Sequence, residues 1–505
     1  MTATVRTRDA ARWSVMGLFL ILCAAIALGV CVLAWGELAV AGVFGLVAFG
    51  VFLMYPVLGL YATTALLLLA GSGATIGSIQ AAIPVTGAKL CGAAAVLAWL
   101  ANLLMRKQNL RLGWEILLLV AFLGWAALGI ANSAVWRDQV PEWIRLATLV
   151  GYFILAVHLL DTREKLHYFV MLILVCGLIM SLFALAQYVL PSLQFSGEAG
   201  FQGLGAGAQK AYVDYEGVQS GPAIRVSGRA GHSNWLAMAL LLILPLNTYW
   251  FSTAKSWRGK CVAVVAVLCE VTALILTFTR LGLLVGLAVA TVLVFKRLVR
   301  FNPYRVSALA VALVAAWFVL PSAYKERVID FTQYSKSSST HARMDLQRYA
   351  WEYMEDEPLV GEGLGGFGLR FQGEDHWVAA NLRWLIDNQG WDPVYYGPHN
   401  MYLQLGAETG VVGLLLALLL LARLIRNVQR SEKALTRAGD RQAAQLAGAI
   451  EVSLLSFVFC ALFLHALLQK IWWMVAVMAV VFPLIHAHVA APKKPDEPTR
   501  ELMPT

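Results

Sequence analysis

The sequence predicts an all-α, polytopic membrane protein, and its composition and its pattern of apolar runs both point to that class. Of the 505 residues, 59% are hydrophobic and only 14% are charged, and the mean hydropathy is +0.68. A soluble domain has about 45–50% apolar and about 25% charged residues. Apolar runs of spanning length, about 17–25 residues, recur along the whole chain between short polar links. We therefore expect about 12 to 14 transmembrane helices, an even number.

Each predicted span is an apolar run bounded by polar or turn-forming residues. The run at 57–70 is too short to cross a hydrocarbon core of about 30 Å without help from its flanks. In chain order, the predicted spans are 14–35, 38–54, 57–70, 88–105, 114–132, 143–160, 168–190, 234–252, 261–279, 281–296, 306–321, 410–424, 448–467 and 471–489.

The distribution of lysine and arginine predicts the orientation, because short positive loops stay on the cytoplasmic side. With the N-terminus in the cytoplasm, alternation of the spans places the short basic links there too, and both termini are predicted to be cytoplasmic. The first span is too long for a signal peptide and lacks a small-residue cleavage site, so we expect it to remain as an anchor. The basic groups are Arg6/Arg8/Arg12, Arg106/Lys107/Arg111, Lys255/Arg258/Lys260, Lys296/Arg297/Arg300/Arg305, the segment 423–441 and Lys493/Lys494.

Two long polar segments, 191–233 and 322–409, fall on the extracytoplasmic side. Loops of that length are uncommon unless they are functional or disordered. The second contains four tryptophans among charges and a helix-like pattern, so we expect a small, mostly helical cap. The predicted organisation is N-terminal helices at 1–190, a loop at 191–233, core helices at 234–321, the cap at 322–409, C-terminal helices at 410–489 and a tail at 490–505.

Arginines dominate the ionisable groups of the extracytoplasmic side. Arg280, in "LTFTRLGLLVG", lies between two apolar runs, where an arginine is costly unless it is paired or faces a polar cavity. Arg225 and Arg229 lie at a similar depth before the next span. A guanidinium binds two phosphate oxygens at once, so these three side chains predict a diphosphate clamp; snorkelling to the interface is the other interpretation of Arg280. For Arg343, Arg348, Arg370 and Arg383 we expect a solvated loop surface.

A histidine stands before the apolar run in "YYGPHNMYLQLGAETGVVG", residues 395–413. Asn400 is a good N-cap for the following helix, and Pro398 prevents an earlier helix. The positive end of the helix dipole disfavours a charged His399, and a neutral imidazole can accept a proton as a general base. The alternative is that His399 only bonds a loop carbonyl and fixes the helix entry.

Other candidate groups are weaker. "GEGLGGFG" contains Gly361-x-Gly363-x-x-Gly366, but it follows no strand and opens no βαβ unit, so we interpret it as a turn that lets the backbone pass close to a ligand or a neighbouring helix. The acidic run 355–357 is expected to be a solvated helix face, and His232 either caps a helix or supports Arg229. All seven cysteines fall within predicted spans, and no metal-ligand spacing appears.

The strings "GEGLGGFG … GPHNMYLQLGAETGVVGLLL", "TFTRLG" and "GRAGHSNWLAMALLLILPL" resemble the O-antigen ligase and polymerase superfamily of bacterial envelope glycosyltransferases. The resemblance covers about residues 220–425. Its Gly-rich turn, Pro-His-Asn and Glu-x-Gly are fairly specific in their spacing. Where the family has Ser-Arg-Gly, this chain has Thr279-Arg280-Leu281, so the arginine is kept.

The resemblance implies a GT-C-like, inverting, metal-independent glycosyltransferase without a cofactor, in the inner membrane of a Gram-negative bacterium, with its site on the periplasmic face. The implied donor is a glycan on undecaprenyl diphosphate, and the acceptor in the ligases is a hydroxyl of lipid A–core oligosaccharide; no nucleic acid is expected. His399 matches the family's essential histidine, and Arg280 with Arg225 or Arg229 matches its phosphate-binding arginines. Supporting or acceptor-contacting candidates are His232, Asn400, Glu408 and Arg145.

Three other activities stay open. Polymerisation of the lipid-linked repeat and transfer to a pilin would use the same chemistry. A lipid-linked oligosaccharide flippase would also be polytopic and basic, but it should have polar or interrupted helices near the midplane. Glu270 and Glu451 are among the few acidic groups inside predicted spans, and each is either a mild point for transport or proton coupling or a simple helix–helix hydrogen bond.

Overall fold

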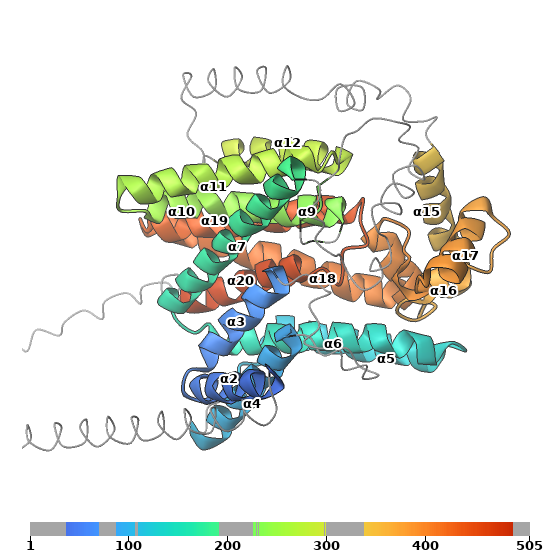
Figure 1. Ribbon diagram of the computed structural model, residues 1–505, viewed down its shortest axis with the longest axis horizontal. Coiled ribbons are helices and arrows are strands. Elements are labelled where there is room, and N and C mark those ends of the chain that lie inside the picture. Colours follow the sequence, from blue (N-terminus) through green and yellow to red (C-terminus); the bar gives the residue numbers. More distant parts are fainter. Residues whose placement is uncertain are drawn as a thin grey trace, which may run out of the picture. The chain divides into compact units, whose positions relative to one another are not determined.

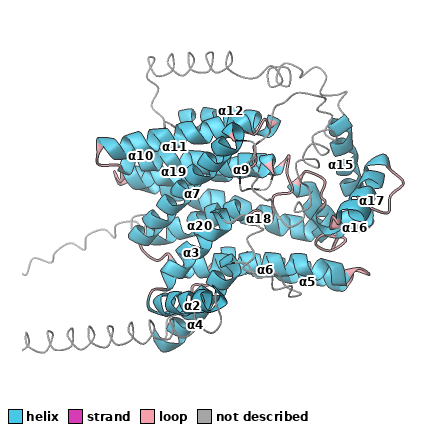
Figure 2. Cartoon of the chain, viewed as in Figure 1, coloured by secondary structure: helices cyan, strands magenta, loops and turns pink. Residues whose placement is uncertain are grey.

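The computed structural model describes residues 37–69, 87–106, 110–190, 226–228, 230, 232–296, 298 and 338–487. Every regular element in these ranges is helical (Figure 2). Eight helices there are long and apolar enough to cross a membrane, and three shorter apolar helices accompany them. The prediction of an all-α, polytopic membrane protein is confirmed. The predicted spans at 14–35 and 306–321 lie outside the described residues.

The first compact unit contains α2 (Glu37–Met54), the first half of α3 (Pro56–Leu69) and most of α4 (Gly87–Arg106). Gly59 of α3 lies against Ala95 of α4, since a methyl group at Gly59 would lie 2.8 Å from the Ala95 Cβ. The Asn102 side chain of α4 donates to the carbonyl of Leu53 at 3.0 Å. Small residues and one side-chain amide therefore hold these apolar helices together, as is usual where lipid removes the hydrophobic driving force.

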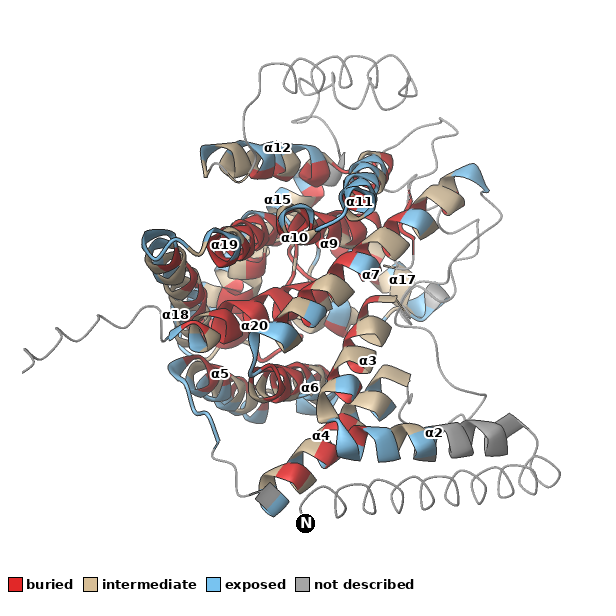
Figure 3. Ribbon diagram, turned by 90° about the vertical axis from the view of Figure 1, so that its left-hand side faces the viewer, coloured by how far each residue is buried: buried red, intermediate tan, exposed pale blue. Residues whose placement is uncertain are grey.

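The second unit holds the rest of the bundle and the cap. Its core is α9, α19 and α20, whose residues are mostly buried, whereas α11 and α12 keep an exposed apolar face that suits contact with lipid (Figure 3). Its bundle elements are α5 (Trp114–Ala131), α6 (Trp136–Leu159), α7 (Arg163–Val189), α9 (Ser233–Ile243), η1 (Leu244–Leu246), α10 (Asn247–Thr253), α11 (Trp257–Leu276), α12 (Arg280–Phe295), α18 (Met401–Arg437), α19 (Arg441–Ala461) and α20 (Lys470–Ile485).

Two helices are longer than the hydropathy predicts. α6 begins at Trp136 rather than near 143, and α18 runs from Met401 to Arg437 rather than from 410 to 424. Hydropathy marks only the apolar centre of a helix, whereas backbone hydrogen bonds continue through the polar turns at both ends. α18 is bent at Gly410, whose φ is 63°.

The predicted helical cap is present in its described part. It consists of α15 (Ser338–Asp356), α16 (Gly366–Phe371), α17 (Trp377–Gln389) and η3 (Pro393–Tyr395), and α15–α17 lie together at the end of the bundle where α18 begins (Figure 1). Its core contains Leu346, Tyr353, Phe367, Phe371 and Leu382. Aromatic side chains therefore dominate the packing between these helices.

The expectation of a solvated surface is wrong for two of the cap arginines. The Arg370 guanidinium lies 4.0 Å from the Tyr353 ring centroid and pairs with Asp356 and Glu362. Arg383 donates to the carbonyls of Gln372 and Glu374 at 2.6 and 2.9 Å. These arginines hold the cap together, because planar guanidinium groups can serve several acceptors at once. Arg348, by contrast, is exposed and pairs with Glu352 one turn away.

Candidate active site

The predicted N-cap of α18 is confirmed. Asn400 Oδ1 accepts hydrogen bonds from the backbone N–H groups of Tyr402 and Leu403 at 3.0 and 3.1 Å. His399 precedes this cap and has a φ of 54°, in the left-handed region. Non-glycine residues rarely occupy that region, and such strain clusters at functional sites. The Pro-His-Asn motif thus gives His399 an uncommon backbone conformation, one residue before the N-cap of α18.

A second strained residue stands beside the predicted phosphate-binding arginine. Within the described residues, Phe278 is the other non-glycine residue with a positive φ, 49°. It lies in the turn between α11 and α12, where Thr279 Oγ1 accepts from the Gly282 N–H at 3.0 Å and caps α12. Arg280 is therefore the first residue of α12, half-buried at the helix start. The two strained positions belong to the two motifs that the sequence singled out.

The chain just after Arg225 is fixed at this same turn. The backbone N–H of Val226 donates to the carbonyl of Leu276, the last residue of α11, at 3.2 Å. Gln187 of α7 accepts from the N–H groups of Ser227 and Gly228 through its side-chain oxygen. Arg225 and Arg229 themselves lie outside the described residues. Val226, which follows Arg225, nonetheless contacts the end of α11, and that end is close in sequence to Arg280.

The Arg280 turn and the His399 motif lie at the same end of the bundle. α10 turns tightly into α11, and α11 turns tightly into α12, so α9 and α12 run parallel. Gly286 of α12 lies 3.6 Å from Leu241 of α9, measured from an added Cβ. Arg280 lies six residues before Gly286, and Trp235 lies six residues before Leu241. Because the two helices are parallel and have the same rise per residue, Arg280 and Trp235 lie at about the same height along the bundle.

A chain of rings connects that level to His399. The Trp235 ring lies 4.9 Å from the His465 ring, and the His465 ring lies 5.5 Å from the His399 ring, between centroids. His465 Nδ1 is buried without a hydrogen-bond partner in the described part of the chain. Burial lowers the pKa of His465 to about 4, so this ring is neutral at pH 7 and puts no positive charge beside His399.

His465 lies in the candidate site but is not among the residues that the sequence predicted. It lies in the link between α19 and α20, whereas hydropathy extended the preceding span to residue 467. The available signal was a histidine at the end of an apolar run. Gly397 permits the approach, since a methyl group there would lie 3.1 Å from the His465 Cβ.

Arg145 is also brought to the His399 loop. Its guanidinium lies 5.0 Å from the ring centroid of Tyr395, four residues before His399. It also forms an ion pair with Glu142 at 2.9 Å. These contacts put a cation of α6 beside the loop.

The remaining supporting candidates act through the backbone. His232 caps α9, because its Nδ1 accepts from the Asn234 N–H at 3.0 Å. Glu408 is buried and accepts from the Gln404 amide at 3.1 Å and from the backbone N–H groups of Gly365 and Phe367. None of the hydrogen bonds described for Glu408 goes to His399. These two residues therefore shape the site by positioning helix ends and the glycine-rich loop.

The glycine-rich segment passes against the bend of α18, which confirms the turn interpretation. Gly361 has a φ of 72°, and a methyl group there would lie 2.6 Å from the backbone of Thr409. The loop N–H of Glu362 donates to the carbonyl of Ala407 at 2.9 Å, and the N–H of Val411 donates to the carbonyl of Pro358 at 2.8 Å. The loop thereby replaces helix hydrogen bonds lost at Gly410 and fixes the first turns of α18 after His399.

A family model described as O-antigen ligase matches residues 261–418. The match runs from α11 through the cap into α18, and it includes both Arg280 and His399. Residues 225–232 and His465 fall outside it. No curated protein matches the chain.

Proposed function

We propose that this member of the O-antigen ligase superfamily transfers a glycan from undecaprenyl diphosphate to a hydroxyl of lipid A–core oligosaccharide. The reaction is a single inverting displacement that needs no metal, on the periplasmic face of the inner membrane. The observation that carries the proposal is the coincidence of the two strained residues, Phe278 and His399, with the arginine and histidine motifs at one end of the bundle.

His399 is the proposed general base. The acceptor hydroxyl is a weak nucleophile that needs a base within about 2.6–3.2 Å, a contribution of about 10²–10⁴ in rate. As its oxygen bonds to the anomeric carbon, the hydroxyl proton passes to His399 and the bond from carbon to the diphosphate oxygen breaks. The neighbouring neutral His465 supports this role, because a charged neighbour would disfavour the imidazolium that forms.

The arginines are the proposed anion site. The leaving diphosphate needs charge stabilisation more than it needs a proton, and fixed guanidinium groups provide it. Arg280 is also the first residue of α12, and the positive end of the helix dipole adds to the positive electrostatic potential there. Arg225 or Arg229 completes the clamp.

The test uses purified protein in detergent with undecaprenyl-diphosphate-linked glycan, lipopolysaccharide that ends in bare core, a chelator and no nucleotide. The readout is the shift of the core band to a ladder on a gel. His399→Ala is compared with His399→Asn, because asparagine tolerates a positive φ and can bond a loop carbonyl but accepts no proton. We expect the wild type to form the ladder and neither variant to do so, with donor binding intact in both. An active His399→Asn would refute the base role.

Two other outcomes identify different functions. Elongation of the lipid-linked glycan without a core ladder would make the protein a polymerase. A flippase is the second candidate, because the structure contains an interrupted spanning helix at Leu244–Leu246. Movement of the donor across vesicles, without transfer to any acceptor, would favour it.

A further inference from the structure

One spanning helix of the core is broken in its interior. α9 and α10 form one membrane-crossing segment, interrupted by the 3₁₀ turn η1 that contains Pro245. A proline inside a helix removes a backbone donor, and in a membrane the freed carbonyls need other partners. α19 donates to two carbonyls that flank the break: Ser453 donates to the carbonyl of Leu242 at 2.7 Å, and Gln445 donates to that of Thr248 at 2.9 Å.

On its other side, the break meets a buried carboxyl group of α11. Asn247, the residue after the break, donates through Nδ2 to Glu270 Oε2 at 2.7 Å. The exposed fraction is 0% for Glu270 and 3% for Asn247. Gly177 of α7 closes the space, because a methyl group there would lie 3.0 Å from Glu270 Oε1. The pair is thus enclosed by helices.

The hydrogen bonds of this pair are incomplete. Glu270 Oε1 and Asn247 Oδ1 are both buried and have no hydrogen-bond partner in the described part of the chain. An ionised carboxylate and an amide oxygen can only accept, so neither atom satisfies the other. Leaving buried acceptors without a donor is costly, and leaving a charge there without a counter-charge costs more.

Nothing described on the packed helices supplies a counter-charge. Next to Gly177, α7 carries Cys176; α10 carries Tyr249, which is bonded to His167; and α9 carries no titratable side chain. α12 begins at Arg280, ten residues after Glu270, and Lys296, which follows α12, pairs with Glu432 and Glu451. No ion pair of Glu270 is present among the described residues.

One proton resolves this arrangement. A carboxylic acid has a hydroxyl donor at one oxygen and an acceptor at the other, which complements a side-chain amide. We propose that Glu270 and Asn247 form a buried proton-binding site, a neutral acid–amide pair that fastens the interrupted helix to α11. The proton comes from water as the chain folds. Glu270 is a positioning residue: it fastens the spanning segment whose first turn carries Trp235, and Trp235 contacts His465 of the candidate active site.

The first test measures the melting temperature of the wild type and of Glu270→Gln in detergent between pH 5 and 8. Glutamine has the shape of a protonated glutamate. A folded protein that keeps a proton which the unfolded chain releases becomes less stable as pH rises, up to tenfold in the folding equilibrium per unit. We therefore expect the melting temperature of Glu270→Gln to increase relative to that of the wild type as pH rises. Glu451→Gln is the matched control, since it removes a buried glutamate that is paired with Lys296. Its melting temperature should not increase relative to the wild type over this range.

The second test does not depend on the stability of the glutamine variant. The infrared spectrum of the wild type at pH 7 should contain the carbonyl stretch of a protonated carboxyl group, and Asn247→Ala should shift that band. A difference in melting temperature that does not change with pH, or the absence of the band, would overturn the proposal. Stabilisation of the wild type by sodium but not by choline would also overturn it, because the carboxylate would then bind a metal cation. None of these outcomes depends on the proposed transferase activity.

Discussion

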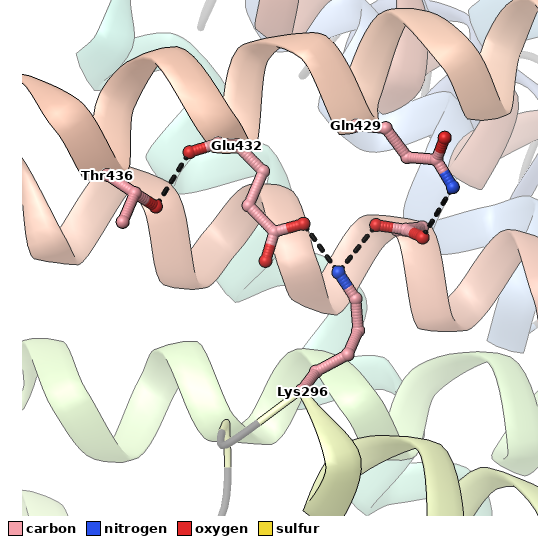
Figure 4. A network of polar contacts seen from close by, with 5 residues as sticks. Lys296, Gln429, Glu432 and Thr436 are labelled. Atoms are coloured by element: carbon pink, nitrogen blue, oxygen red, sulfur yellow. Dashed lines mark hydrogen bonds and ion pairs between the residues drawn. The ribbon is translucent and has the colours of Figure 1, made fainter.

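The two ends of α18 differ in how their polar groups are satisfied. At the start of the helix, a histidine with a positive φ contacts a buried histidine whose Nδ1 has no hydrogen-bond partner in the described residues. Toward the other end, Lys296 Nζ lies between the carboxylates of Glu432 and Glu451 at 2.5 and 2.6 Å, and Gln429 donates to Glu451 at 2.9 Å (Figure 4). About 45 Å of helix, measured along its bent axis, separates these regions.

The comparison indicates a division of labour. Paired charges between α12, α18 and α19 fix the packing of three helices, as polar contacts do in lipid. Backbone strain at His399 and the buried Nδ1 of His465 cost stability at the start of α18, and proteins keep such features where chemistry requires them. We therefore expect changes at the start of α18, near His399 (the cap end), to alter glycan transfer. Changes near Lys296, Glu432 and Glu451 (the paired end) should alter stability.

After the loss of His399, the largest expected effect is at Arg280. Arg280→Ala should lower kcat about 10²–10³-fold, the usual loss when one fixed donor to a developing anion is removed. Arg280→Lys should recover only part of it, because an ammonium group keeps the charge but cannot bind two oxygens in one plane. Single-turnover transfer rates measure both. Full activity of the lysine variant would mean that Arg280 acts only through its charge and does not bind two phosphate oxygens at once.

Gly361→Ala should destabilise the protein by about 3 kcal/mol, from the left-handed backbone and the overlap with α18. The matched control is Gly390→Ala, which has a similar φ of 65° but nothing within 4 Å of the added methyl group. Melting temperature and transfer are measured for both. Equal losses would show that the close passage of the loop against α18 contributes nothing beyond backbone strain.

Most of the fold could be predicted from the sequence, because the length of an apolar run indicates a spanning helix. The cap was predicted as helical from its aromatic and charged pattern, and Asn400 was predicted as an N-cap from residue type alone. The bend at Gly410 was not predicted, since it lies against the backbone of Leu359, which is distant in the chain and approaches only after folding.

The site was predictable where a motif is local and was missed where tertiary packing makes it. Arg280 and His399 stood out because each interrupts or borders an apolar run. His465 did not, because its importance comes from the Trp235 and His399 rings that packing brings to it. The roles of Arg370 and Arg383 were misjudged for the same reason: a charged residue in a polar segment gives no sign of the groups that it will bind after folding.

At the paired end, Lys296→Met should destabilise the protein by about 2 kcal/mol. Breaking a buried ion pair typically costs about 3–5 kcal/mol, and partial exposure of Lys296 and Glu432, 20% and 21%, lowers that cost. The protein that remains folded should transfer glycan at the wild-type kcat. A reduced kcat at full folding would contradict the division between the two ends.

The smallest expected effect is a pH dependence at His465. Its pKa lies near 4 in the folded protein and at 6.5 in the unfolded chain, because burial disfavours the charged ring. The unfolded chain therefore binds the proton first as pH falls, and the wild type loses about 1 kcal/mol between pH 6.5 and 5.5. His465→Gln lacks this loss, so its melting temperature should fall less over that range. Parallel curves for the two proteins would mean that His465 titrates in the folded state as it does when unfolded, and a charged ring beside His399 would then weaken the case for a base at that position.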